Sequence, residues 1–448
     1  MMSMARQKRN IAAGVLCGLL IVCGAAVWCD FHKMIPAGKE REITIGVFSD
    51  SYWEVQNGYS YYILNDAIEL FEKQNPDVKV SYVSGILKED YSEWLSERLL
   101  MGDAPDIFFV LPEDFNDLAE LGALRSLSPF SREDEEFSRD RFYASAYVYG
   151  QFDKEQYALP YECAPKLMFV NRSILDGEGI PMPGGDWRWD DFYDICERVT
   201  KDTDGNGIPD QFGVVDYTWQ DAFDSNGVEL FSQNGEECFL SGSNVRESVS
   251  FVDRLESLNS GYSITNREFD VGNVVFQPMS FSEYRAYKPY PLSVKKYSGF
   301  DWECIPMPAG PEGDNISSLD TLLIAMNKNT KNAEYAWEFM KLLTCNEQIQ
   351  SEIFEYSEGV SVLKEVTNSE RTLVKLREHV EDTDILNHVI LSDAVENAAS
   401  APRFRNYDDA VSEVDRAVRD IVESNSNIST GLTIWNRTIN RKLKNNGW

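Results

Sequence analysis

A loop dense in carboxylate and amide side chains is the stretch whose residue types and spacing most directly suggest chemistry. Its possible ligands are Asp202, Asp204, Asn206, Ile208 and Asp210. They fall at positions 1, 3, 5, 7 and 9 of an EF-hand-type calcium loop, with the backbone carbonyl of Ile208 at position 7. The bidentate glutamate expected at position 12 is replaced by Gly213, so calcium needs a further ligand from outside the loop. We expect a structural Ca²⁺ here; the alternative is an ion-free turn held by side-chain-to-backbone hydrogen bonds.

Aromatic and acidic side chains form a second group of candidates, because they directly follow predicted strands. Tyr52 and Trp53 come after an apolar run at 43–48, and Glu113 and Asp114 come after another at 107–111. In parallel α/β sheets, ligands bind outside the carboxyl ends of the strands. The pattern therefore predicts a ligand site built from these four residues.

The elements that must position these residues alternate between strand and helix. Predicted strands at 43–48, 78–83 and 107–111 are separated by helices, one of which carries an apolar stripe of Leu64, Ala67, Ile68 and Phe71. This alternation is typical of a parallel sheet covered by helices. The second half repeats the pattern less clearly, with strands expected at 166–170, 212–217 and 274–279.

Composition excludes several classes of function. The 448 residues are enough for two or three hydrophobic cores, and 43% hydrophobic residues are typical of a globular protein. A formal charge of −32 makes a nucleic-acid partner improbable, since such a surface repels phosphates. The sequence contains none of the short signatures of serine hydrolases, zinc proteases or P-loop nucleotidases. Three histidines and scattered cysteines give little material for a zinc site or a disulfide framework.

The N-terminus predicts export. Arg6, Lys8 and Arg9 precede an uncharged stretch at 11–28, which is the pattern of a secretory signal and is also barely long enough to span a membrane. Cys23 has the position of a lipidated cysteine in a bacterial lipoprotein signal, although Val22 before it is bulkier than usual. We expect 1–29 to be a signal peptide or membrane anchor, with the body tethered to the outer face of the cell membrane.

The stretch 157–213 resembles the extracellular solute-binding proteins of ABC transporters, in the sugar-binding family 1 that includes maltodextrin-binding protein. It has Tyr157-x-x-Pro160, a strand ending in Asn171, a Gly/Pro turn, Trp189 opening a helix, and the Asp/Gly/Asn loop ending in Gly213. A Pro/Gly crossing near 300–311 and an Ala-Trp-Glu-Phe helix near 333–343 extend the resemblance over most of the chain. The run Val-Val-Phe-Gln-Pro-Met at 274–279 departs from the family pattern, so the ligand on that side is expected to be atypical.

The resemblance implies an α/β fold with two lobes, each a mostly parallel sheet flanked by helices, and a ligand cleft between them. The expected N-terminal lobe is 42–163 with 308–359, and the C-terminal lobe is 164–307 with 360–448. It also implies a monomer that captures a solute without bond-making. The solute is then delivered to two membrane permease subunits with an ATPase.

The aromatic content indicates a carbohydrate, because a sugar presents an apolar face to rings and hydroxyls to carboxylates. The expected ligand-binding residues are Tyr52, Trp53, Glu113, Asp114, Tyr161, Glu162, Trp219, Tyr284 and, for an anionic group, Arg403. We expect no catalytic residue and no required cofactor. The alternatives are a secreted carbohydrate-active enzyme using two carboxylates, and a surface sensor built on the same fold.

Overall fold

The computed structural model describes residues 41–53, 61–83, 85–287, 300–377, 388–424 and 427–445. The predicted signal or anchor segment 1–29, with Cys23, lies outside the described residues. Within the described ranges, no helix combines the length and the apolar character that a membrane crossing requires.

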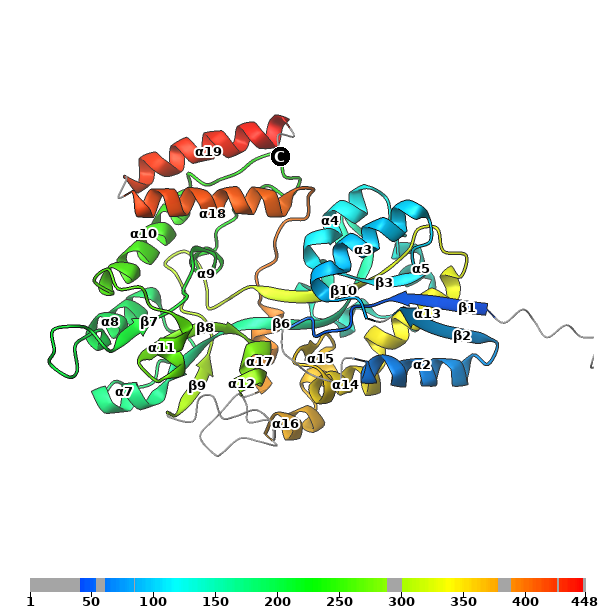
Figure 1. Ribbon diagram of the computed structural model, residues 1–448, viewed down its shortest axis with the longest axis horizontal. Coiled ribbons are helices and arrows are strands. Elements are labelled where there is room, and N and C mark those ends of the chain that lie inside the picture. The colour runs from blue at the N-terminus through cyan, green and yellow to red at the C-terminus, as the bar shows by residue number, and fades with distance from the viewer. Residues whose placement is uncertain are drawn as a thin grey trace, which may run out of the picture.

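One long strand, β6 (Ala158–Asn171), runs through the middle of the molecule and belongs to both halves (Figure 1). Its first part pairs with β10 (Leu319–Met326) and β11 (Val360–Ser361), and its second part pairs with β8 (Val274–Ser280) and β9 (Trp302–Ile305). All its residues are buried except Lys166, which is half-buried. The sequence predicts only 166–170 as strand, because Pro160 and Pro165 interrupt the β pattern.

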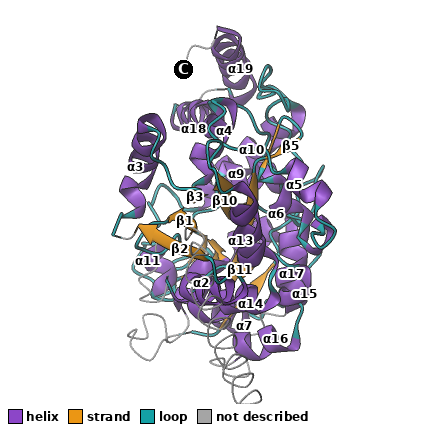
Figure 2. Cartoon of the chain, turned by 90° about the vertical axis from the view of Figure 1, so that its right-hand side faces the viewer, coloured by secondary structure: helices purple, strands orange, loops and turns teal. Residues whose placement is uncertain are grey.

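The first lobe lies on one side of this strand. Its strands are β1 (Arg41–Gly46), β2 (Val78–Val83), β3 (Ile107–Val110), β10, β11 and the short hairpin β4 (Gln151–Phe152) and β5 (Glu155–Gln156). Its helices are α2 (Tyr62–Gln74), α3 (Lys88–Met101), α4 (Pro112–Glu120), α5 (Ser128–Glu133), η1 (Arg139–Arg141), α6 (Ala144–Val148), α13 (Ala333–Cys345), α14 (Glu347–Tyr356), α15 (Lys364–Thr367), α16 (Glu370–Arg377) and α17 (His388–Glu396). Helices α3 and α4 cover one face of the sheet, and α2, α13 and α14 cover the other (Figures 1 and 2).

The second lobe is built on β7 (Phe212–Val214), β8 and β9. Its helices are α7 (Arg172–Glu178), α8 (Trp189–Val199), α9 (Trp219–Ser225), α10 (Ser243–Leu258), α11 (Asn266–Asp270), α12 (Phe281–Tyr287), α18 (Tyr407–Glu423) and α19 (Ile428–Asn445). Two apolar clusters fill this lobe. One lies around α8, β7 and β8, and the other joins α9 and α10 to the α18–α19 hairpin.

The predicted two-lobed α/β architecture is confirmed, and the sheet is mixed. Its strand order is β2-β1-β3-β10-β6-β8-β7. The pairs β1–β2, β1–β3 and β7–β8 are parallel, as βαβ units require. The strands β10, β11, β8 and β9 pair antiparallel with the shared strand β6, and β10 also pairs antiparallel with β3.

The chain passes between the lobes along β6, through the segment 306–318, and through the segment 397–406. Elements β11, α15, α16 and α17 pack against α14 and α6 of the first lobe, and Val366 and Leu391 belong to its core. The predicted division placed 360–448 in the C-terminal lobe, whereas in the structure the chain returns to that lobe only after α17. No linker composition marks this crossing, so the sequence offers no signal for it.

Gly213 is required where α8 packs on β7. A Cβ atom at this position would lie 2.5 Å from the Cβ of Cys196 and 2.6 Å from its Cα, and a buried helix has no room to yield by that much.

We therefore expect Gly213→Ala to lower the free energy of unfolding by about 1–3 kcal/mol, the usual cost of overpacking a core. Urea denaturation measures this. The control is Gly177→Ala in α7, where an added Cβ meets no atom within 4 Å and should raise stability by about 0.5–1 kcal/mol. Equal stability of Gly213→Ala and the native protein would contradict the close contact.

Candidate ligand-binding cleft

A cleft of about 1750 Å³ lies between the lobes. Its walls come from the N-terminal ends of α4, α9 and α18, from the start of β10, and from the crossing segment around 399–403. Small-molecule pockets usually measure about 300–1,000 Å³. The cleft is therefore large enough for a solute of several rings.

Five of the nine predicted ligand residues line this cleft: Tyr52, Trp53, Glu113, Trp219 and Arg403. Tyr52 and Trp53 meet edge to face, with ring centroids 4.5 Å apart. The Lys88 ammonium lies 4.9 Å from the Tyr52 ring centroid and donates a hydrogen bond of 2.7 Å to the Tyr52 carbonyl. Three of the four residues that the carboxyl-end rule selected therefore lie on the cleft wall.

Trp219 reaches the cleft only with part of its ring. Its side chain is 7% exposed and packs against Phe223, and its Nε1 donates to the Asp415 carboxylate at 3.1 Å. Trp219 therefore also holds α9 against α18, so removal of its ring would perturb the second lobe as well as the cleft wall.

Arg403 stands in the crossing segment between α17 and α18. Its guanidinium lies 4.1 Å from the ring centroid of Tyr149, another cleft residue. Its Nε and Nη2 atoms are buried and have no hydrogen-bond partner among the described residues, and burial lowers the pKa of this guanidinium. The cation is thus held mainly by the face of Tyr149.

The structure adds three carboxylates that the sequence reading missed: Asp224 on α9, Asp320 at the start of β10, and Asp408 in the first turn of α18. Desolvation, followed by the charge of Asp221, raises the pKa of Asp224 to about 7, while Lys166 lowers it. Desolvation, followed by Glu113 across the cleft, raises the pKa of Asp408 to about 6, while Arg403 lowers it. Asp320 lies on the cleft floor, where desolvation raises its pKa and Lys166 and Lys88 lower it.

Lys166, the half-buried residue of β6, forms an ion pair with Asp221 at 2.6 Å. Asp221 is 3% exposed and also accepts hydrogen bonds from Thr218 at the start of α9. This pair joins the shared strand to the second-lobe wall.

Two other residues of the cleft wall carry buried polar atoms. Asn116 is 3% exposed and Thr321 is fully buried. The Oδ1 atom of Asn116 and the Oγ1 atom of Thr321 have no hydrogen-bond partner among the described residues. Buried polar groups are rarely left unpaired, so these atoms are suited to a bound ligand.

Three predicted ligand residues do not line the cleft. Asp114 accepts a hydrogen bond from Ser92 at 2.5 Å, between α4 and α3. Tyr161 is buried against Phe109. Glu162 is buried on β6 and accepts from Ser357 at 2.5 Å. The side chain of Tyr284, on α12, lies outside the described residues.

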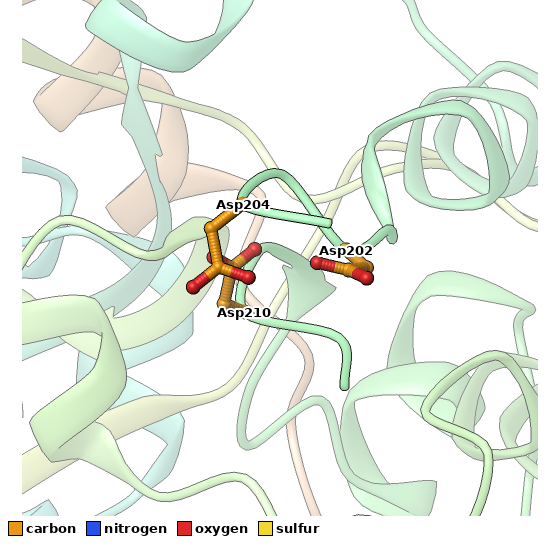
Figure 3. Close-up of side chains that lie close together, drawn as sticks. All are labelled: Asp202, Asp204 and Asp210. Atoms are coloured by element: carbon orange, nitrogen blue, oxygen red, sulfur yellow. The ribbon is translucent and has the colours of Figure 1, made fainter. Parts of the chain in front are cut away.

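The Asp202 loop brings three of its predicted ligands together (Figure 3), and none of them lines the cleft. One carboxylate oxygen from each of Asp202, Asp204 and Asp210 lies within 4.8 Å of the others. The same side chains hold the loop: Asp202 accepts from the backbone N–H groups of Gly205 and Gly207, and Asp210 accepts from Thr203. The loop therefore has both the acidic cluster and the turn hydrogen bonds that the sequence suggested.

The family described as bacterial extracellular solute-binding protein matches residues 54–350 of this chain. The chain belongs to this family.

The family membership confirms the resemblance found in the sequence, and the family is one of binding proteins. A lipoprotein encoded in the oleD 5' region of Streptomyces antibioticus is 24% identical to this solute-binding protein over 263 residues. That match covers 53% of this chain and 54% of the relative, so the chain spans about half the length of the curated relative it matches.

Two solved structures share the fold of this solute-binding protein. The sugar-binding protein MalE from Xanthomonas citri is 14% identical, with a TM-score of 0.73 over 91% of this chain and 98% of that one. The cyclic α-maltosyl-1,6-maltose binding protein from Arthrobacter globiformis is 15% identical, with a TM-score of 0.73 over 90% of this chain and 99% of that one. At these identities the likeness shows the fold alone.

The burial of Glu162 makes the stability of the folded protein depend on pH. Burial raises its pKa to about 7 from a reference value of 4.5, although the hydrogen bond from Ser357 opposes the shift. The folded state therefore holds a proton that the unfolded chain releases, and this stabilisation is complete below pH 4.5 and lost as pH rises through 7.

We expect Glu162→Gln, which keeps the acceptor for Ser357, to be about 1–3 kcal/mol more stable than the native protein at pH 8 and nearly equal to it at pH 4.5. Urea denaturation at both pH values checks this. Glu97→Gln, on the exposed side of α3, should show no such difference. The same stability difference for Glu162→Gln at both pH values would be evidence against a buried carboxyl group.

Proposed function

We propose that this solute-binding protein captures an oligosaccharide by closing its two lobes over the cleft and delivers it to the permease of an ABC importer. The observation that carries the proposal is the lining of the cleft. Aromatic rings from both lobes line it together with carboxylates and with two buried polar atoms, Asn116 Oδ1 and Thr321 Oγ1, that have no hydrogen-bond partner among the described residues. Rings cover the apolar face of a sugar, and carboxylates accept hydrogen bonds from its hydroxyls.

The size of the cleft favours an oligosaccharide over a single sugar. A second hollow of about 1230 Å³ adjoins it and shares Gln233, Ser400, Ala401 and Arg403 with it. The turn of the β4–β5 hairpin and the end of α19 also line this hollow. A chain of several rings could extend from one hollow into the other. The described ligands of similar folds, such as cyclic α-maltosyl-1,6-maltose and maltotetraose, are of this class.

The partners of this function would be two permease subunits with an ATPase, and the binding protein itself would act as a monomer. Lipidation at Cys23, or retention of the 1–29 segment as an anchor, would keep it on the outer face of the membrane. The lipoprotein relative supports this placement.

The test is a binding panel of linear and cyclic gluco-oligosaccharides, followed by calorimetry on any sugar that raises the melting temperature. We expect one-to-one binding, and we expect Tyr52→Ala to weaken it at least about tenfold, equivalent to about 1.4 kcal/mol. The control is Tyr335→Ala, a half-buried tyrosine of the same lobe that faces Arg41 away from the cleft. If no oligosaccharide binds, or if both variants bind equally well, the sugar proposal fails.

We also propose that the Asp202 loop binds Ca²⁺ in a structural role. The clustered carboxylates and the EF-hand-like spacing support this. A ligand that binds only the folded state stabilises it by about 2.7 kcal/mol at 100 times its dissociation constant. Calcium should therefore raise the melting temperature relative to a chelator.

The rise in melting temperature that calcium produces should disappear in Asp202→Ala. It should persist in Asp186→Ala, which changes an exposed aspartate just before α8. Comparing each variant with and without chelator separates the loss of an ion from the loss of turn hydrogen bonds. Identical melting curves of the native protein in calcium and in chelator would rule out the ion.

A further inference from the structure

The charge of the cleft is unbalanced. Among the residues that the structure describes, seven carboxylate and three cationic side chains line it. The cations already have local roles: Lys166 is paired with Asp221, Lys88 binds the Tyr52 carbonyl, and Arg403 lies over Tyr149. The excess negative charge is therefore not neutralised within the described wall.

Glu113, Asp224, Asp320 and Asp408 are among the lining carboxylates that make no hydrogen bond or ion pair with any described residue, although Lys166 and Lys88 lower the pKa of Asp320 and Arg403 lowers that of Asp408. They come from both lobes: Glu113 from α4 and Asp320 from β10 in the first lobe, and Asp224 and Asp408 from α9 and α18 in the second. Lobe closure must bring these like charges closer together. A neutral solute would leave that repulsion in place.

The neighbouring polar atoms can also accept hydrogen bonds, although the hydroxyls among them can donate as well. Asn116 follows Glu113 by one turn of α4, so its buried Oδ1 faces the same part of the cleft. Thr321 follows Asp320 directly, and Tyr407 precedes Asp408 and also lines the cleft. Unpaired acceptors beside an aromatic ring form the environment that an ammonium group requires, because it offers only donors and is attracted to ring faces.

We propose that the natural solute is an amino-bearing oligosaccharide whose protonated amine sits between Glu113 of the first lobe and Asp408 of the second when the lobes close. This rests on the proposed function, and it deepens it by naming the charge of the ligand. The amine would join the two walls, so that binding and closure reinforce each other.

The experiment uses matched pairs of sugars that differ in charge. One pair is the glucosamine tetrasaccharide and its N-acetylated form; the other is 6-amino-6-deoxymaltotetraose and maltotetraose. Calorimetry at pH 7.5 is run in 20 mM and 200 mM NaCl. We expect the amino member of at least one pair to bind at least about tenfold more tightly than its neutral partner, with a smaller difference at high salt, because salt screens exposed charges.

Glu113→Gln and Asp408→Asn should each remove most of this preference, so that in each variant the amino sugar and its neutral partner bind within about threefold of each other. Asp409→Asn, which changes the exposed neighbour that does not line the cleft, should keep the preference. Melting curves confirm that each variant is folded.

Each outcome distinguishes the two proposals. If neutral sugars bind as tightly as their amino partners, the proposed amino group is wrong, and the proposed oligosaccharide-binding function is unaffected. Neutral binding that strengthens with added Mg²⁺ or Ca²⁺ would replace the amine with a metal ion. If no member of either pair binds and the oligosaccharide panel also shows no binding, both the amino group and the oligosaccharide-binding function are contradicted. If the panel identifies a neutral sugar while these pairs do not bind, only the amine is overturned.

Discussion

The continuous hydrogen-bonded ladder of β6 is the constraint on which the rest of the structure depends. One strand completes the sheet of the first lobe through β10 and β11, and the sheet of the second lobe through β8 and β9. Its side chains are buried on both faces, so a slip of register would move every one of them to the wrong side. The lobes can therefore move only by bending or twisting at β6 and at the two other crossings, and Lys166, near the middle of the strand, ties it to the cleft wall.

The cleft follows from this arrangement because the strands around β6 end at its edge. Helices α4 and α9 begin there and present Glu113, Asn116 and Asp224 to the space between the lobes. A buried polar group without a partner costs about 1–3 kcal/mol, and desolvated carboxylates add to that cost. A ligand that pairs with these groups recovers this free energy on closure, which gives the closed state the differential affinity that a conformational change requires.

Much of the fold could be predicted from the sequence, and less of the site. The stripe of Leu64, Ala67 and Phe71 identified α2, and the carboxyl-end rule placed Tyr52, Trp53 and Glu113 on the cleft wall. It failed for Asp114, one residue along, because helical geometry turns that side chain toward Ser92. Asp224, Asp320 and Asp408 converge from three distant elements, and no local pattern marks such a meeting. Likewise, the return of the chain to the second lobe after α17 depends on tertiary packing rather than on composition.

The central claim is that the two lobes close on a bound solute while β6 stays intact. The most direct measurement is the distance between spin labels at L100C on α3 and I434C on α19, positions in different lobes whose native side chains are 89% and 57% exposed. Pulsed electron resonance would compare the free protein with protein saturated by an oligosaccharide that binds. Closure of the lobes predicts a shorter, narrower distance distribution in the bound state. An unchanged distribution at saturation would contradict it.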